Sequence, residues 1–216
     1  MIKKILIWTL LPWCFAAAAN AANAADTAGT TAAADAAPTA AAVPVEQLHR
    51  ALIAAMKGGK RLGYRGRYDK LKPVVENSFD FPFIARLILG PDWDKLSGPQ
   101  RQSLEAALAK LSLSSYAREF DGYSGESFQR MSARALGNDV LERYLFKPSS
   151  GDVIHFDYQL HRSAAGWKIA NVVVDGVSDL ALKRGQYRKL FQEKGFEGLI
   201  AWIDKQIADN AGDDNA

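Results

Sequence analysis

The sequence has one cysteine, Cys14, and only three histidines. Cys14 lies in an N-terminal stretch that we expect to be removed, so the mature chain can form neither a disulfide nor a thiolate site. His155 and His161 stand six residues apart on one predicted strand, roughly 20 Å, which is too far to share a metal ion. No nucleophile elbow is present, because residues 122–126 lack the final glycine of that motif. We therefore expect no enzyme, no metal and no cofactor.

The chain also lacks a strong excess of charge and a long apolar run. It carries 27 basic and 24 acidic residues, and removing Lys3 and Lys4 leaves 25 basic residues and a net charge near +1. Such a balance argues against nucleic acid as a partner and against a strong global attraction to membranes. The longest apolar stretch, residues 5–19, is shorter than the roughly 20 residues of a membrane span and contains Pro12.

The N-terminus has the pattern of a secretory signal peptide. Lys3 and Lys4 precede the apolar residues 5–19, and Ala22-Asn23-Ala24 forms a small-residue cleavage site. A lipoprotein is disfavoured, because Pro12 and Trp13 precede Cys14 where a lipobox has small residues. We predict a signal peptide at 1–24, a periplasmic location, and a disordered Ala/Thr-rich leader at 25–44.

Residues 45–210 are predicted to form one domain, with a polar tail at 211–216. Apolar residues spaced three and four apart predict a helix from Val45 that stops at Gly58-Gly59. The following residues 57–67 contain five basic residues and four glycines. They suit either a patch for anionic headgroups or nucleic acid, or a solvated loop before a helix at 68–78 that tolerates Pro73 only near its first turn.

Two further helices have clear start signals. Asp80 caps a helix to Gly90 that is apolar nearly all round, so this helix either lies in the core or lines a cavity. Ser97 and Gln100 form a capping box before a long helix at 99–120. After the last strand, Ser178 is predicted to cap a helix that Gly195 closes, and a final helix carries an apolar stripe from Phe196 to Ile207.

From Ser127 the apolar period changes from 3.6 to 2. Four strands are predicted, at 127–136, 140–147, 152–162 and 166–174, and their short connections imply an antiparallel meander. The third strand should turn Ile154, Phe156, Tyr158 and Leu160 to the core and its histidines to water. The last strand is apolar on both faces, so it should be covered on both sides. The order predicts an α+β fold, with helices packed on one face of a curved four-stranded sheet enclosing an apolar pocket.

The predicted pocket suits a ligand with long apolar tails. A two-tailed lipid has roughly 30 methylenes, and at about 0.8 kcal/mol each its tails cost on the order of 20 kcal/mol to hold in water. A carrier must therefore enclose them. The residues that we expect to line the pocket are large and apolar: Phe79, Phe83, Leu87, Ile88, Trp93, Leu108, Leu111, Phe120, Tyr144, Phe146, Phe156 and Tyr158.

The C-terminal third resembles a known family. The string WKIANVVVDGVS from Trp167, then RGQY and GFEGLIAWI, is similar to the end of the toluene-tolerance family of periplasmic lipid-binding proteins. Its best-known branch carries phospholipid in the pathway that maintains outer-membrane lipid asymmetry. FDFP at 79–82 and YAREFDGYSG at 116–125 look more like its hopanoid-biosynthesis-associated branch. The resemblance covers residues 45–207.

This resemblance implies a fold of the nuclear-transport-factor-2 kind and a function without covalent chemistry. It implies a soluble shuttle for phospholipid, with an inner-membrane ABC transporter and an outer-membrane lipoprotein complex as partners. For the hopanoid branch it implies a polycyclic cargo and a resistance-nodulation-division exporter. Two other classes stay open: a protein-interaction module with a fully packed core, and a small-molecule isomerase using Asp157 with a tyrosine. Strand parity places Asp157 and Tyr158 on opposite faces, which disfavours the isomerase.

Overall fold

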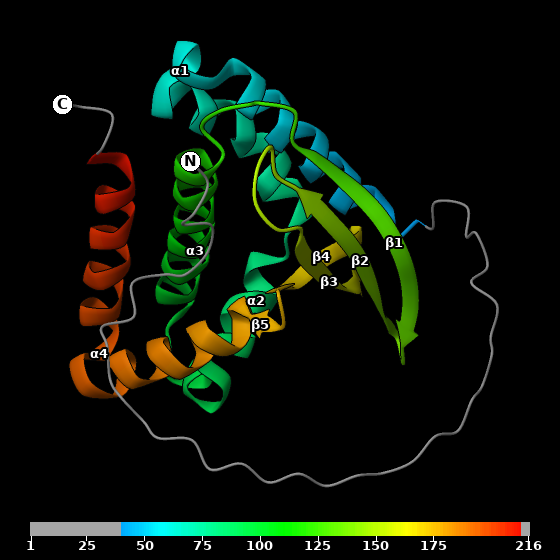
Figure 1. Ribbon diagram of the computed structural model, residues 1–216. Helices are drawn as coiled ribbons and strands as arrows, with labels where there is room; N and C mark the ends of the chain where they lie inside the picture. Colours follow the sequence, from blue (N-terminus) through cyan, green and yellow to red (C-terminus); the bar gives the residue numbers. More distant parts are fainter. Residues whose placement is uncertain (1–39, 213–216) are drawn as a thin grey trace, which may run out of the picture.

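The structure, a computed structural model, describes residues 40–212, which form four α-helices, a 3-10 helix and five strands (Figure 1). The helices are α1 (Ala42–Ser78), α2 (Phe81–Leu89), η1 (Gly90–Lys95), α3 (Gly98–Glu119) and α4 (Asp179–Ala211), and the strands are β1 (Ser127–Leu136), β2 (Asp139–Lys147), β3 (Ile154–Ser163), β4 (Gly166–Val174) and β5 (Val177–Ser178). None of the helices in this range is long and apolar enough to cross a bilayer.

Some predicted segments fall outside this range or change their boundaries. The predicted signal peptide, residues 25–39 of the leader and residues 213–216 of the tail lie outside the described residues. Residues 42–44, which we assigned to the leader, form the first turn of α1. At the other end, α4 continues to Ala211.

The strands form one antiparallel sheet in the order β1-β2-β3-β4-β5, as the short connections predicted. The two-residue β5 is an addition to the four predicted strands. The predicted alternation of β3 is confirmed from His155 to Leu160, because Phe156, Tyr158 and Leu160 are buried while His155 is exposed. His161, which we expected to face water, is instead covered: its side chain is 14% exposed and stacks on Phe83. The register shifts once between β1 and β2, at Met131, and once between β3 and β4, at Ala170.

Strand β4 is covered on both sides at its centre. Ile169 and its neighbour Ala170 are both buried, and α1, α2 and α4 all contact this strand. Asp80 at the start of α2 donates its backbone N–H to the Ile169 carbonyl at 3.1 Å. The α+β class, with helices packed against an antiparallel sheet, is therefore confirmed.

The first helix differs from the prediction between residues 57 and 67. The first helix is interrupted at Gly59, as predicted, and again at Gly63, where the φ angles are 45° and 61°. The residues around these two glycines are helical and do not form an open loop. The second half of α1 therefore begins before Tyr68, and Pro73 lies inside the helix and not in its first turn. Gly195 breaks α4 in the same way, with φ of 69°, where the sequence predicted a helix end.

The predicted N-caps are confirmed at three helices. Asp80 Oδ1 accepts the Phe83 backbone N–H at 3.0 Å, and Ser178 Oγ accepts that of Ala181 at 3.1 Å. At α3 the capping box is complete, because Ser97 Oγ accepts from the Gln100 N–H while Gln100 Oε1 accepts from the Ser97 N–H. These caps mark the first residues of the three helices.

Replacing Ser97 by alanine should lower the free energy of unfolding by about 1 kcal/mol, because the first turn of α3 loses its side-chain acceptor. Chemical denaturation monitored by circular dichroism measures the change. Ser103→Ala is the matched control, because Ser103 is exposed within the same helix and is not a cap. Equal losses in the two variants would contradict the role of the capping box.

Candidate functional site

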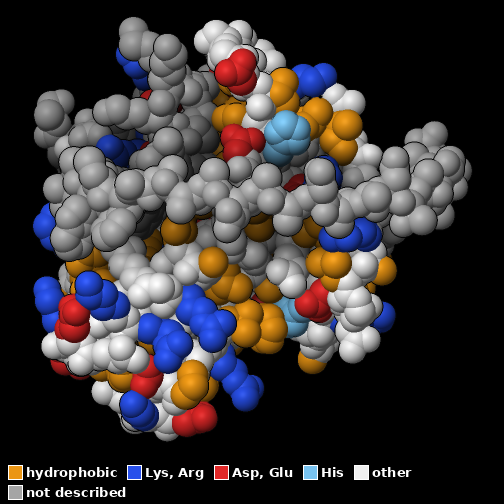
Figure 2. All heavy atoms as spheres, turned by 60° about the horizontal axis from the view of Figure 1, so that its bottom comes forward, with side chains coloured by type: hydrophobic (Ala, Val, Ile, Leu, Met, Phe, Trp, Pro, Cys, Tyr) orange, Lys and Arg blue, Asp and Glu red, His pale blue; other side chains and the backbone are white. Residues whose placement is uncertain are grey.

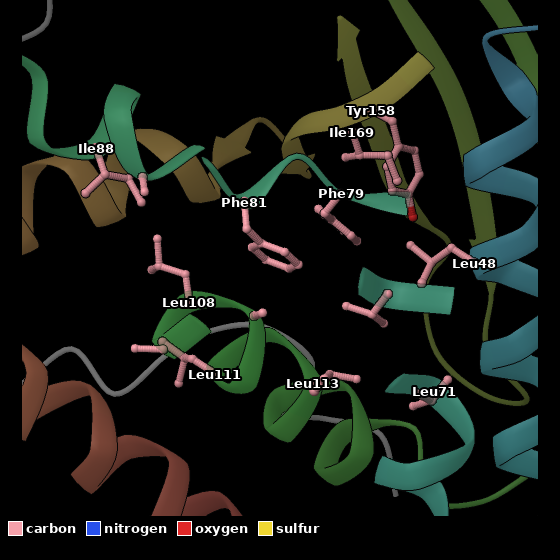
Figure 3. Close-up of a cluster of buried hydrophobic side chains, with 14 of the residues drawn as sticks. Leu48, Leu71, Phe79, Phe81, Ile88, Leu108, Leu111, Leu113, Tyr158 and Ile169 are labelled. Carbon is pink, nitrogen blue, oxygen red and sulfur yellow. The ribbon is translucent and has the colours of Figure 1, made fainter. Parts of the chain in front are cut away.

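The interior between the helices and the sheet is a continuous cluster of apolar side chains. Figure 3 shows Leu108, Leu111 and Leu113 of α3 on one side, and on the other Phe79, just after α1, and Phe81, the first residue of α2. Tyr158 and Ile169 approach from the sheet in the same view, and Ile88 extends the cluster along α2. All the labelled side chains in this figure are at most 8% exposed. The cluster therefore joins α1, α2, α3 and the sheet into one core.

Nine of the twelve predicted lining residues lie in this core. They come from both helices and strands: Phe79, Ile88, Leu108, Leu111, Phe120, Tyr144, Phe146, Phe156 and Tyr158. Trp93 of η1 is partly buried and packs against the core, with the Arg101 guanidinium 5.3 Å from its ring centroid. The structure thus brings ten of the predicted residues into one cluster or against its edge.

Phe83 and Leu87 of α2 are placed differently. Both are partly exposed and lie outside the core cluster, whereas Phe81, Ala85 and Ile88 of the same helix are buried in it. The Phe83 ring stacks on His161 with ring centroids 4.0 Å apart. The residues that face inward are those spaced three and four apart from Phe81, and Phe83 and Leu87 form a second stripe beside them.

The sheet side of the core is a continuous group of aromatic rings. Phe146 lies 4.8 Å from Phe128 and 6.1 Å from Phe120, and Phe156 lies 6.0 Å from Tyr158, all measured between ring centroids. Phe128 was not among the predicted lining residues, although it lies directly opposite Phe146 in the β1–β2 register. Its pairing with Phe146, a predicted core residue, was the signal that could have identified Phe128.

His49 of α1 was also missed, and it lies at the centre of this aromatic group. Its ring stacks on Phe128 at 3.7 Å and meets Tyr144 and Tyr158 edge-on. A hydrogen bond of 2.8 Å joins His49 Nε2 to the Tyr158 hydroxyl. Burial lowers the pKa of His49 to about 3, so the ring is neutral near pH 7. The spacing of His49 from Val45 and Leu52 on the apolar stripe of α1 was the available sequence signal.

The tyrosines of this group are neutral as well. Burial raises the pKa of Tyr158 well above its ordinary value, and the nearby Tyr116 and Tyr144 add to the shift. Burial also raises the pKa of Tyr144, and the negative charge of Glu142 raises it further. The aromatic interior can therefore contact apolar tails without presenting a charge to them.

One ion pair lies at the edge of the aromatic group. The Arg130 Nε and Nη2 atoms donate to the two carboxylate oxygens of Glu142 at 2.8 and 3.0 Å. The Glu142 side chain is fully buried, and that of Arg130 is 21% exposed. Glu142 lies opposite Tyr158 in the sheet, and Arg130 lies opposite Tyr144. The pair thus introduces two mutually compensated charges beside an otherwise uncharged interior.

Among residues 40–212, no three His, Cys, Asp or Glu side chains lie close enough together to hold a metal ion. His155 pairs with Asp175 on the exposed side of the sheet, and His161 pairs with Asp80 at 2.9 Å. The two histidines thus make separate contacts.

This architecture is shared with a known protein family. The model of the family described as MlaC protein matches residues 46–205. The chain belongs to the MlaC family. This is a family of lipid-binding carriers and not of enzymes, and its members are typically periplasmic. It includes the toluene-tolerance proteins that the C-terminal sequence resembles.

A solved structure has the same fold. A phospholipid-binding protein from Ralstonia solanacearum, solved in complex with a phospholipid, superposes with a TM-score of 0.68 at 21% sequence identity. The similarity covers 79% of this chain and 98% of that protein. Almost the whole of the Ralstonia protein is therefore represented here, including its helices and its antiparallel sheet.

Proposed function

We propose that this MlaC-family protein is a soluble carrier of phospholipid in the periplasm. The observation that carries the proposal is the continuous, uncharged interior between α3 and the sheet, in a fold shared with a phospholipid-bound protein. The carrier would receive and release its lipid at an inner-membrane ABC transporter and an outer-membrane lipoprotein complex. No step requires covalent chemistry, because the lipid only moves between apolar surroundings.

The energetics favour such an interior for this cargo. Apolar tails removed from water gain about 0.8 kcal/mol per methylene, and rings and branched side chains supply the surface that replaces water. A charge facing the tails would oppose binding, because moving a charge into apolar surroundings is costly. The neutral His49, Tyr144 and Tyr158 meet this requirement, and the charges of Arg130 and Glu142 beside them compensate each other.

We infer that α2 and η1 border the route to this interior. Ile84 and Trp93 are partly exposed and pack against the core, so a tail that passes them would reach Ile88 and Leu108. Figure 2 shows hydrophobic side chains exposed between groups of Lys and Arg on the face that lies at the bottom of Figure 1. Val177 and Leu182, at the start of the α4 region, are 53% and 52% exposed.

The direct test is mass spectrometry of organic extracts from the purified mature protein, together with the native mass of the unextracted sample. We expect a stoichiometric phospholipid. A polycyclic hopanoid would instead support the cargo suggested by the hopanoid-like motifs, which stays a prediction. A protein that contains no lipid, and acquires none from vesicles, would overturn the proposal and favour a protein-interaction module.

A pair of substitutions on α2 tests the position of the lipid. Ile84→Asp should lower the amount of co-purified phospholipid about tenfold, because it places a charge at the edge of the core. Leu87→Asp is the matched control: it adds the same charge to a partly exposed residue of the same helix, outside the core cluster. Circular dichroism must show both variants folded. Equal loss in the two variants would mean that the lipid also contacts the stripe of Phe83 and Leu87.

A further inference from the structure

A second candidate site lies at the sharp bend of α1, away from the apolar core. A cavity of about 500 Å³ opens there, and its lining residues come from residues 56–60 of α1 and residues 121–123 of the segment between α3 and β1. Figure 1 shows this segment passing alongside the bend on its way to β1. The lining includes two lysines, Lys57 and Lys60, one carboxylate, Asp121, and the ring of Tyr123. The lining therefore carries a net positive charge, unlike that of the core.

The bend that forms this cavity is held in place by a buried arginine. Arg67 is 4% exposed, and its Nε donates to the Ala117 carbonyl at 2.7 Å while its Nη1 donates to the Gly59 carbonyl at 3.2 Å. Gly59 needs its positive φ of 45°, and a Cβ there would lie 3.4 Å from the Asp121 carbonyl oxygen. Arg67 thus fixes the α1 wall of the cavity to the end of α3, and the Asp121 carbonyl of the other wall lies close to Gly59.

The α1 side of the cavity carries positive charge only. Residues 57–67, which we call the basic bend, contain Lys57, Lys60, Arg61, Arg65 and Arg67 and no acidic residue. Lys57, Lys60 and Arg61 are exposed, and Arg65 pairs with Asp69 at 3.1 Å. Asp121 offsets only part of this charge. The basic bend is therefore a local cationic surface on a mature chain whose net charge is near +1.

Tyrosines accompany these cations. The Lys57 nitrogen lies 4.9 Å from the Tyr123 ring centroid, and the Arg65 guanidinium lies 5.8 Å from that of Tyr68. Tyr123 is 40% exposed, so its ring and hydroxyl can contact a partner. Lysine, arginine and tyrosine together are the residues that contact the headgroup layer of bilayers, where the cations meet phosphates and the amphipathic ring lies at the interface.

We propose that the cavity of the basic bend binds the phosphate of a lipid headgroup and so brings the protein to the surface of an anionic bilayer. Lys57 and Lys60 donate to the phosphate oxygens, and Tyr123 lies against the headgroup layer. This contact is separate from the carriage of lipid in the core, because no lining residue of the cavity except Met56 belongs to the core cluster. It would keep the carrier near membranes between transfers.

The test is co-sedimentation of the mature protein with vesicles. We expect binding to vesicles that contain phosphatidylglycerol, little binding to phosphatidylcholine alone, and weaker binding as salt is raised. The double variant Lys57→Gln/Lys60→Gln should bind about tenfold more weakly, because each lysine near an anionic surface contributes to attraction. Lys110→Gln/Lys194→Gln is the control, since it removes the same charge from exposed residues of α3 and α4.

Several outcomes would overturn the proposal. Equal binding by the two double variants would mean that net charge alone attracts the protein. Binding of free glycerol 3-phosphate at Lys57 and Lys60, seen by NMR without vesicle binding, would assign the cavity to a soluble phosphate ligand. If the protein bound neither vesicles nor glycerol 3-phosphate, the cavity would not be a phosphate site. Extracts of the same samples separate these results from carriage, because phospholipid in the core should be retained in the wild type and in both double variants.

Discussion

Replacing Arg130 by methionine should lower the free energy of unfolding by about 3 kcal/mol, because it leaves the buried Glu142 carboxylate without its bidentate partner. For a domain of this size the melting temperature should fall by roughly 6–12 °C. The reason is an asymmetry: two charges that compensate each other in the interior are tolerated, whereas one alone is strongly destabilising. Thermal unfolding followed by circular dichroism, at neutral pH, measures the effect.

Two further variants test this explanation. Arg130→Met/Glu142→Leu removes both charges and should recover most of the lost stability, because apolar residues can replace a buried ion pair at little cost. Arg143→Met breaks a pair of the same bidentate geometry with Asp157, at 2.8 Å for both bonds, but the Arg143 side chain is 51% exposed. That loss should be below about 1 kcal/mol. Equal effects of Arg130→Met and Arg143→Met would show that burial of Glu142 does not govern the cost.

Acidification should destabilise the protein through His49. The unfolded chain binds a proton at this residue near pH 6.5, whereas the folded protein does so only near pH 3, because burial lowers the pKa. Stability contributed by the neutral ring is therefore fully present above pH 6.5 and is lost as the pH falls, by about 1.4 kcal/mol per unit. At about pH 4 the loss from His49 alone should reach about 3 kcal/mol.

His49→Gln isolates this contribution. Glutamine does not titrate, so the difference in unfolding free energy between the wild type and the variant should shrink as the pH falls from 6.5, even though other groups also titrate. Glu46, Arg130 and Glu142 lie near the aromatic group and are common to both proteins, so their contributions largely cancel. Urea unfolding at several pH values provides the measurement. A difference that does not change with pH would mean that the pKa of His49 is the same in the folded and the unfolded protein.

The sequence alone predicted the order and type of nearly all the elements. Alternating apolar residues identified four strands, and the capping residues Asp80, Ser97 and Ser178 marked three helix starts correctly. These signals are local: a cap depends on atoms three residues away, and strand periodicity follows from the pleat. At the basic bend the sequence located the interruption at Gly59 correctly. The loop expected after it was wrong, because contacts of Arg67 hold a tight bend within α1.

The sequence also predicted most of the residues of the apolar interior, but not which way each side chain faces. A helix that is apolar nearly all round, such as α2, carries no signal for its rotation, so the sequence could not separate Ile84 from Phe83 and Leu87. The pairing of β1 with β2 and the packing of α1 on the sheet placed Phe128 and His49 among the aromatic rings. Only those long-range contacts decided that a histidine would be buried and neutral, because burial depends on neighbours distant in the sequence. The same contacts brought Lys57 and Tyr123 together at the bend of α1.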